Sequence, residues 1–263
     1  MHPFLEKPPS RKQLKETFLD SLKSELPKDQ VNCIAHMILV FEDPVEVATV
    51  ALDYLIARLG ICRADLGFAG PADALYAPAI VSYNSATAPL RCDGAVYSNK
   101  APVLQRTWSQ TAPVACDEVV SHPYLADSRT EFLDIHSKSI LFQRLTFGRV
   151  PVGMMCLDFT HDVHQWSTPE TNLVANFAKD ILGPLAGISR HWSARHYDPA
   201  ALRKPTGAEL EAIRLVAAGL NDAEIGIRLG KSARTIENQL RSARLSLQAC
   251  NRAELVRKCE MWL

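Results

Sequence analysis

The stretch TGAELEAIRLVAAGLNDAEIGIRLGKSARTIENQLRSARLSL, residues 206–247, divides into three short helical segments. The first segment opens at Thr206, and Glu209 follows three residues later. At this spacing the hydroxyl and the carboxylate reciprocally satisfy free amides of the first helical turn. Gly219 stands where a left-handed residue usually closes a helix. We therefore predict a helix from Thr206 to about residue 218.

A second and a third helix follow at once. Asn221 and Glu224 form another capping pair, and Gly230 ends that segment after about two turns. Ser232 then caps a third helix with one apolar and one basic side. The apolar side is Ile236, Leu240 and Leu247, and the basic residues are Arg234, Arg241 and Arg244. Two short helices joined by a tight turn, with arginines on the second, predict a helix-turn-helix that places the second helix in the major groove of DNA.

A further capping pair, Asn251 and Glu254, begins a fourth helix and completes a small all-α domain. Over residues 205–263 the chain resembles the LuxR-type output domain of bacterial transcription regulators. The resemblance rests on a set of matching positions, namely Thr206, Glu211, Gly219, Glu224, Ile225, Leu229, Ser232, Thr235, Ile236, Leu240, Asn251 and Arg252.

Four positions depart from the pattern of that family. The opening reads Pro205-Thr206-Gly207 instead of Leu-Thr-Pro, Gln239 replaces a frequent histidine, and Ser246 replaces a frequent basic residue. These departures leave the predicted fold intact, but the family's usual operator sequence does not carry over.

The resemblance implies double-stranded operator DNA as a partner, two operator half-sites occupied by a homodimer, and RNA polymerase as a possible further partner. We expect the contacts to phosphates or base edges to come from eight residues: Lys231, Ser232, Arg234, Thr235, Glu237, Asn238, Arg241 and Arg244. Of these, Glu237, Asn238 and Arg241 occupy positions that face base edges in this family.

Charge is unevenly distributed along a chain whose formal net charge is zero. Residues 201–263 contain 11 Lys and Arg against 7 Asp and Glu, whereas residues 1–200 contain 18 against 22. A basic module on a mildly acidic body suits phosphate binding, because affinity for DNA is largely electrostatic. An ordinary solvated surface with the same charge is the alternative interpretation.

A chain of 263 residues, 47% of them hydrophobic and 22% charged, is typical of a globular protein with one or two domains. The N-terminus lacks the apolar stretch of a signal peptide, and no apolar run is long enough to cross a bilayer. We therefore expect a cytoplasmic protein without a membrane partner. Seven cysteines without a C-x-x-C pair indicate reduced thiols. Cys116, beside Asp117 and Glu118, is a poor redox sensor because neighbouring carboxylates disfavour the thiolate.

Helices dominate the beginning of the chain. An apolar stripe on an amphipathic helix, formed by Leu14, Phe18, Leu22 and Leu26, requires a partner surface and is a candidate for dimerisation, together with Val256 and Met261 of the last helix. A second apolar helix is predicted over about residues 30–41. Asp43 and Pro44 then begin a long helix that Gly60 closes.

Strands follow from residue 61. Cys62, Ala64, Leu66 and Phe68 alternate with Arg63, Asp65 and Gly67, as in a strand with one face in water. Residues 70–102 read as loops with a short strand over 79–83. Residues 139–147 and 150–159 predict an antiparallel hairpin whose second arm, apolar on both faces, is central. A final helix, capped by Ser167 or Thr168, carries Leu173, Val174, Phe177 and Ile181.

This order of elements predicts an α+β sensor with an antiparallel sheet flanked by helices. Residues 43–190 resemble a GAF domain. The resemblance rests on Asp117, His122-Pro123, Ser139-Ile140-Leu141, Pro151-Val152-Gly153 and the stretch from Phe159 to Glu170, and Arg144 departs from a frequent proline.

Domains of this kind usually hold a small molecule between the sheet and the middle loops. The candidate ligand-binding residues comprise apolar walls and polar anchors: Trp108, Phe142, Met154 and Cys156 as walls, and His136 or Asp158 as an anchor. Plain core packing is the alternative for each of them. The effector itself is not identified by the sequence.

Neither a metal nor an enzymatic activity is expected. His161 and His164 have H-x-x-H spacing, but they lie in a predicted loop where only Asp162 could join them. No Gly-rich phosphate loop and no G-x-S-x-G motif is present, so a nucleophile and a cofactor cradle are both lacking. We therefore predict no cofactor beyond a small-molecule effector.

Together these patterns predict a ligand-responsive transcription regulator. Its parts are N-terminal helices over 1–42, a GAF-like sensor over 43–190, a linker over 191–204 and a LuxR-type DNA-binding domain over 205–263. Two rival classes share this output domain. A phosphorelay regulator requires an acidic pair, a phosphorylated Asp and a Lys that we do not find. An acyl-homoserine-lactone sensor requires a Trp, Tyr, Asp and Trp set that Trp108 and Trp166 alone do not supply.

Overall fold

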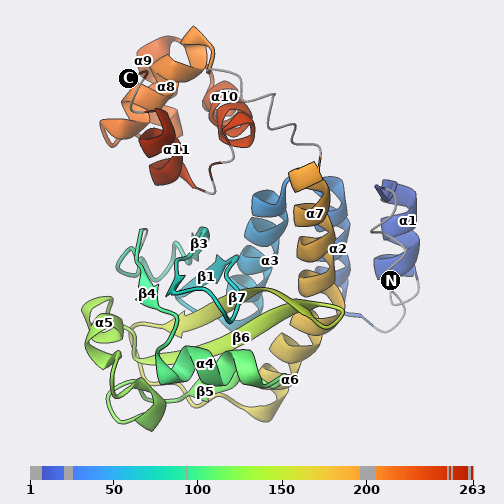
Figure 1. Cartoon of the computed structure of the whole chain (residues 1–263), viewed down its shortest axis with the longest axis vertical. Helices are drawn as coiled ribbons and strands as arrows, with labels where there is room; N and C mark the ends of the chain where they lie inside the picture. The colour runs from blue at the N-terminus through green and yellow to red at the C-terminus, as the bar shows by residue number, and fades with distance from the viewer. Residues whose placement is uncertain are drawn as a thin grey trace. The chain divides into compact units, whose positions relative to one another are not determined.

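The computed structural model describes residues 8–20, 26–92, 94–195, 205–247, 249, 251–259 and 262. The chain forms two compact units, Met1–Ala194 and Arg195–Leu263. Figure 1 shows the elements of both. The predicted linker, 191–204, begins inside a helix, because α7 continues to Arg195, and residues 196–204 lie outside the described part.

The first unit combines helices with short and long strands. Its helical segments are α1 (Arg11–Lys15), η2 (Glu16–Asp20), α2 (Lys28–Leu39), α3 (Pro44–Leu59), α4 (Pro102–Ser109), η3 (Pro123–Leu125), α5 (Arg129–Asp134), α6 (Thr168–Phe177), η4 (Ala178–Leu182) and α7 (Gly183–Arg195). Its strands are β1 (Arg63–Gly67), β2 (Leu75–Tyr76), β3 (Ile80–Tyr83), β4 (Tyr97–Ser98), β5 (Val114–Cys116), β6 (Ser139–Phe147) and β7 (Val150–Phe159).

A five-stranded sheet organises this unit, in the order β3-β1-β7-β6-β5. Every neighbouring pair is antiparallel. The predicted hairpin is confirmed as β6 and β7, which are joined at Gly148 with a left-handed φ of 61°. β7 lies in the middle of the sheet, as its apolar sequence predicts. β2 and β4 form a separate two-stranded sheet.

Alternate residues of the central strands face two different cores. Met155 and Leu157 of β7 belong to a large core that α2, α3, η4 and α7 cover. Met154 and Cys156 face the opposite core, beneath α4 and α5. Figure 1 shows α2, α3 and α7 on one side of the sheet and α4 on the other. The sheet is thus buried on both faces, which explains why β7 has no polar face.

Local capping sets the helix boundaries that the sequence predicts. The Asp43 carboxylate accepts a hydrogen bond from the Val45 amide (2.8 Å), and Gly60 ends α3 with a φ of 68°. Ser167, rather than Thr168, caps α6 and forms a capping box with Glu170. These ends are confirmed because each depends only on residues within one helical turn.

The apolar stripe predicted to mediate dimerisation is largely buried against other helices of the same chain. Leu14 and Phe18 are buried in the core shared with α2 and α3, and Leu26 packs against that core. Leu22 lies outside the described residues. The amphipathic pattern correctly indicates a buried face, but the partner of that face is the unit itself.

The second unit contains the predicted succession of short helices. They are α8 (Gly207–Ala217), α9 (Asp222–Leu229), α10 (Ala233–Ser246) and α11 (Arg252–Cys259). Capping boxes at Thr206 and Asn221 are both present, and Gly230 is left-handed with a φ of 63°. Ile213, Ile225, Ile236, Leu240 and Leu255 lie in its core.

Close approach of the backbone fixes the turn between α9 and α10. A Cβ atom on Gly226 would lie 2.7 Å from the Lys231 carbonyl oxygen. The Lys231 amide donates back to the Gly226 carbonyl at 2.8 Å.

In the described part of the chain, no helix combines the length and the apolar character needed to span a membrane.

Candidate functional site

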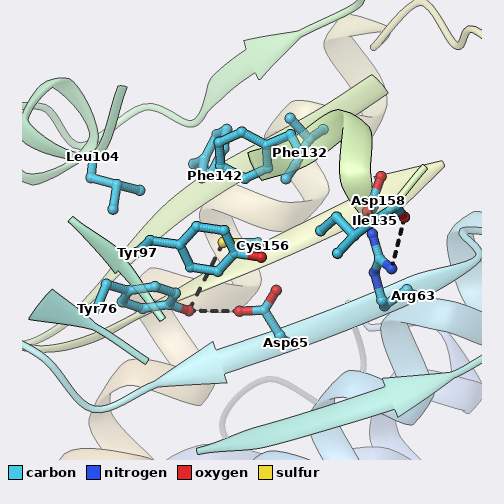
Figure 2. Close-up of a pocket in the computed structure, with 11 residues that line it drawn as sticks. Arg63, Asp65, Tyr76, Tyr97, Leu104, Phe132, Ile135, Phe142, Cys156 and Asp158 are labelled. Atoms are coloured by element: carbon cyan, nitrogen blue, oxygen red, sulfur yellow. Dashed lines mark hydrogen bonds and ion pairs between the residues drawn. The ribbon is translucent and has the colours of Figure 1, made fainter. Parts of the chain in front are cut away.

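A pocket lies on the face of the sheet that α4 and α5 cover. Figure 2 shows side chains from β1, β2, β4 and β7 converging on it. The lining residues are Arg63, Asp65, Tyr76, Tyr97, Leu104, Phe132, Ile135, Ile140, Phe142, Cys156 and Asp158. Its free volume is about 10 Å³, which is room for about one water molecule. A larger occupant therefore requires the aromatic walls to move.

Arg63 on β1 is the deepest charged residue of the pocket, with 1% of its surface exposed. Its guanidinium donates to the Asp158 carboxylate, to the Ser137 hydroxyl (3.1 Å) and to the carbonyls of Leu90 (2.7 Å) and Ile135 (3.2 Å). These contacts connect β1 to β7, to the segment between β3 and β4, and to the segment between α5 and β6. A charge so buried is stable only when it is paired and hydrogen bonded.

Asp158 completes the ion pair but leaves one oxygen unused. Its Oδ2 accepts from Arg63 and from the Ser137 hydroxyl at 2.7 Å. Its Oδ1 is buried and has no hydrogen-bond partner among the described residues. Burial raises the pKa of this carboxyl to about 6, although the Arg63 charge opposes the rise. The pocket thus presents one acceptor that a ligand or a water molecule could satisfy.

A second carboxyl, Asp65, lies two residues further along β1. The Tyr76 hydroxyl donates to its Oδ1 at 2.7 Å (Figure 2). Withdrawal from water raises the pKa of Asp65 to about 7, and the Tyr76 hydrogen bond and the Arg63 charge lower it only in part. The Cys156 thiol approaches the same Tyr76 oxygen at 3.9 Å. Near neutral pH the protonation of Asp65 is therefore sensitive to any charge that enters the pocket.

Three of the residues predicted to bind a ligand line this pocket, namely Phe142, Cys156 and Asp158. The other three do not. Trp108 is buried and donates to the Asn99 side chain at 2.8 Å, and Met154 is buried in the same core as the apolar lining but does not itself line the pocket. His136 has a left-handed φ of 60° and an exposed side chain, whereas its neighbours Ile135 and Ser137 face the pocket network.

Arg63 and Asp65 line the pocket but are not among the residues that the sequence predicts for it. Their alternation with apolar residues predicted a face in water, and this part of the prediction is wrong because that face forms the floor of the pocket. The signal that could have identified them is charge complementarity, since Arg63 is the register partner of Asp158 on β7. The two charges can be recognised as partners only when the pairing of β1 with β7 is known.

A second hollow of about 190 Å³ lies where β6 extends beyond β5. Its lining comes from the segment before β5, from β6 and from α6 and η4, and comprises Thr111, Ala112, Gln143, Arg144, Thr146, Ala175, Asn176 and Lys179. Its two charged side chains, Arg144 and Lys179, are basic. Arg144 also donates to the Trp108 carbonyl at 2.7 Å.

The H-x-x-H pair does not converge on one point. His164 Nε2 lies 3.0 Å from the Glu170 carboxylate, whereas His161 Nδ1 lies 3.5 Å from the Cys62 sulfur. Within the described part of the chain, no three His, Cys, Asp or Glu side chains are arranged to hold a metal ion.

The residues predicted to contact DNA lie on or just before α10. Five have exposed side chains (Ser232, Arg234, Thr235, Glu237 and Asn238), and three are half-buried (Lys231, Arg241 and Arg244). The opposite side of α10, with Ile236 and Leu240, is buried. The Ser232 and Thr235 hydroxyls are 2.8 Å apart, and the Thr235 amide donates to Ser232, so both side chains help to cap the helix.

No protein-family model and no curated protein matches the chain. Solved structures do match the first unit. The phycoerythrobilin-bound GAF domain from a cyanobacterial phytochrome aligns with 65% of this chain and 100% of its own, with 11% identity and a TM-score of 0.51. The GAF domain from Acinetobacter phosphoenolpyruvate-protein phosphotransferase covers 65% and 99%, with 8% identity and a TM-score of 0.46. Free methionine-R-sulfoxide reductase from Neisseria meningitidis covers 64% and 95%, with 17% identity and a TM-score of 0.46.

The likeness to the phytochrome domain, together with the antiparallel sheet covered on both faces, identifies a GAF-like fold in the first unit. This confirms the predicted α+β fold class for the N-terminal part of the chain. At such identities the likeness concerns the fold alone, and function rests on the side chains of this chain.

Proposed function

We propose that the protein is a DNA-binding transcription regulator whose GAF-like unit responds to a small molecule. The observation that carries the proposal is the arrangement of α9 and α10 as two consecutive helices joined by a tight turn. A short turn with Gly226 against Lys231 joins two short helices, and α10 turns Arg234 and Asn238 outward while Ile236 is buried. This is the geometry by which a helix-turn-helix presents its second helix to the major groove.

The resemblance of residues 205–263 to the LuxR-type output domain supports the same proposal. The basic residues of α10 supply the attraction to phosphates, which is sequence-independent and weakens with salt. We propose that two copies of the chain bind two operator half-sites about 34 Å apart. RNA polymerase is the further partner that such a regulator would contact.

The pocket of the first unit supports control by an effector. Its walls are aromatic and aliphatic, and its polar groups are concentrated at Arg63, Asp65 and Asp158. Binding sites for small molecules have this composition. The unused Asp158 Oδ1 favours an effector with a hydroxyl or amine donor beside an apolar body. We propose no catalytic activity for the unit.

The antiparallel sheet argues against the phosphorelay alternative. The receiver domain of a response regulator is doubly wound around a parallel sheet, whereas all pairs of the five-stranded sheet here are antiparallel. An acyl-homoserine lactone stays a candidate effector. Its acyl chain would need Tyr97 or Phe132 to move from the pocket.

DNA binding is tested by selecting duplexes from a random pool with the full chain and measuring affinity for the selected operator. Arg234→Ala and Arg241→Ala should weaken binding and reduce the slope of log affinity against log salt by about one for each lost phosphate contact. Arg257→Ala is the control, because Arg257 lies on α11 beside Glu254 at 3.7 Å. Selection of no sequence, or equal losses in all three variants, would contradict the proposal.

Effector binding is tested by native mass spectrometry of the freshly purified chain. We expect an added mass that disappears on denaturation. Leu104→Trp, which enlarges a buried wall of the pocket, should prevent the addition, whereas Leu75→Trp alters an exposed side chain and should keep it. Circular dichroism establishes that both variants are folded. A mass retained by Leu104→Trp would place the effector elsewhere.

A further inference from the structure

Cys62, the residue before β1, contacts a histidine. Its sulfur lies 3.5 Å from His161 Nδ1, and the same nitrogen lies 3.2 Å from the Thr160 hydroxyl. Thr160 and His161 directly follow β7, which pairs with β1 along its length. The sheet register therefore brings the thiol and the imidazole together from positions 99 residues apart.

Polar groups surround this sulfur, and the His161 ring is the one in direct contact with it. Burial raises the pKa of the Cys62 thiol, but hydrogen bonds from the Thr160 amide and hydroxyl, from His161 and from the Thr87 hydroxyl lower it below the ordinary value of a cysteine. A thiolate, rather than a thiol, is the reactive form of cysteine.

The other described cysteines have different surroundings. Cys33 contacts the Met37 sulfur at 3.8 Å, and burial raises its pKa to about 12. Burial also raises the pKa of Cys92 to about 11 and that of Cys116 to about 12. Cys156 and Cys259 lie in the two smaller cores, and burial raises the pKa of both thiols. Among the described cysteines, Cys62 is thus the one with a stabilised thiolate.

Access to the sulfur is narrow. Cys62 has 3% of its surface exposed, but the His161 side chain that contacts it is exposed. His161 belongs to the segment between β7 and α6, so the imidazole that contacts the sulfur lies outside the sheet.

We propose that Cys62 and His161 form an oxidant-reactive thiol site that takes small hydroperoxides. The Cys62 thiolate attacks one peroxide oxygen, so an S–O bond forms and the O–O bond breaks. The sulfur is oxidised by two electrons to a sulfenic acid. The thiol proton passes to His161 Nδ1, which contacts the sulfur. The peroxide is reduced, and its departing oxygen takes that proton, leaving as water when the oxidant is hydrogen peroxide.

This site lies next to the pocket but does not depend on the proposed function. The Cys62 amide donates to the Asp158 carbonyl at 2.9 Å, and the next residue, Arg63, holds the Asp158 carboxylate. Oxidation at Cys62 therefore occurs one residue from the ion pair of the pocket.

The first test uses competition among thiols in one molecule. A Cys250→Ser chain, in which every remaining cysteine has described surroundings, is exposed to less than one equivalent of hydrogen peroxide and then to dimedone, which labels sulfenic acids. Peptide mass spectrometry should find the label at Cys62 and little at the other five positions. Preferential labelling of another cysteine, or no label at any position, would overturn the proposal.

The second test measures the role of the imidazole. The rate of Cys62 alkylation by iodoacetamide is followed against pH in the wild-type chain, in His161→Asn and in His164→Asn. We expect His161→Asn to raise the pH midpoint and to slow alkylation at pH 7 about tenfold for each pKa unit gained. His164→Asn, which removes the histidine paired with Glu170, is the control and should match wild type. A midpoint unchanged in His161→Asn would show that the pair is structural only.

Discussion

Arg63 on β1 and Asp158 on β7 are register partners in the sheet, and their side chains form an ion pair that is almost completely buried. Ser137 donates to the same Asp158 oxygen and accepts from Arg63, so three elements meet at this point. The pair lies on the floor of the pocket (Figure 2). It therefore connects β1 to β7 and also lines the pocket.

Removal of one partner should be costly. Arg63→Ala leaves the Asp158 carboxylate buried without its counter-charge, which typically costs about 3–5 kcal/mol. We expect a loss of that size in the free energy of unfolding, measured by urea denaturation. The exposed pair of Arg58 and Asp29, 3.8 Å apart, is the control, and Arg58→Ala should cost less than about 1 kcal/mol.

The double variant Arg63→Leu with Asp158→Leu distinguishes the contribution of the paired charges from that of the surrounding hydrogen bonds. Because both charges disappear together, it should be more stable than Arg63→Ala alone. A double variant as unstable as the sum of the two single changes would show that the hydrogen bonds to Ser137 and the two carbonyls, not the pairing of charge, stabilise the site.

Stability should fall with rising pH because of Asp65. Its pKa is about 7 in the fold, compared with about 3.9 for an unperturbed aspartate. Between these values the folded chain holds a proton that the unfolded chain has released. The stabilising contribution is therefore complete below pH 4 and is lost as the pH rises to 7, by about 1.4 kcal/mol for each pH unit.

Asp65→Asn should flatten this slope, as measured by urea denaturation at pH 4.5, 5.5, 6.5 and 7.5. Asp158, whose pKa is about 6, keeps a smaller slope of the same sign. Asp53→Asn changes an exposed aspartate and should leave the profile parallel to that of wild type. A slope that persists in full in Asp65→Asn would contradict the assignment.

The turn of the second unit should not tolerate a methyl group at Gly226. The added Cβ would lie 2.7 Å from the Lys231 carbonyl oxygen, and that backbone cannot move without disturbing α10. Gly226→Ala should destabilise the unit by about 1–3 kcal/mol, since overpacking outweighs the better helix propensity of alanine. Gly207→Ala meets nothing within 4 Å and should be neutral or stabilising in thermal unfolding.

The elements that the sequence predicts well are those with local signals. Capping boxes at Thr206, Asn221 and Ser167 begin their helices where the pattern indicates, and two apolar runs on either side of the turn at Gly148 define β6 and β7. The short strand predicted over 79–83 is confirmed as β3, but the rest of residues 70–138 is predicted poorly. β2 and β4 contain two residues each, which is too short for an alternation of apolar residues to be recognised. α4 begins after Ala101 without a side-chain cap, so no capping residue predicts its start.

The site depends on long-range packing that no local pattern contains. Alternation along β1 groups Arg63 with Asp65 on one face, but α4 and α5 decide that this face is covered. The stripe with Leu14 similarly indicates a buried face without naming its partner. The contact between Cys62 and His161 requires the register of β1 against β7.

Glu237 differs from the other residues along the predicted recognition helix, because it is acidic among Arg234, Arg241 and Arg244. A carboxylate near phosphates is repelled unless it has a specific partner. One explanation is a local ion pair with Arg234 or Arg241, which are three and four residues away. Among the described residues, the structure contains no ion pair at Glu237, and its side chain is exposed.

The other explanation, which can hold together with the first, is the proposal that Glu237 reads a base. A carboxylate in the major groove accepts a hydrogen bond from the amino group of cytosine, and such a contact discriminates by about 1–3 kcal/mol. Glu237→Ala should therefore relax the preference at one symmetric position in each half-site, while overall affinity holds or rises because a negative charge has gone. Selection from random duplexes with wild type, Glu237→Ala and the control Glu211→Ala on α8 measures both effects. A selected motif that is identical in all three proteins would exclude base readout by Glu237 and would leave the carboxylate with an electrostatic effect alone.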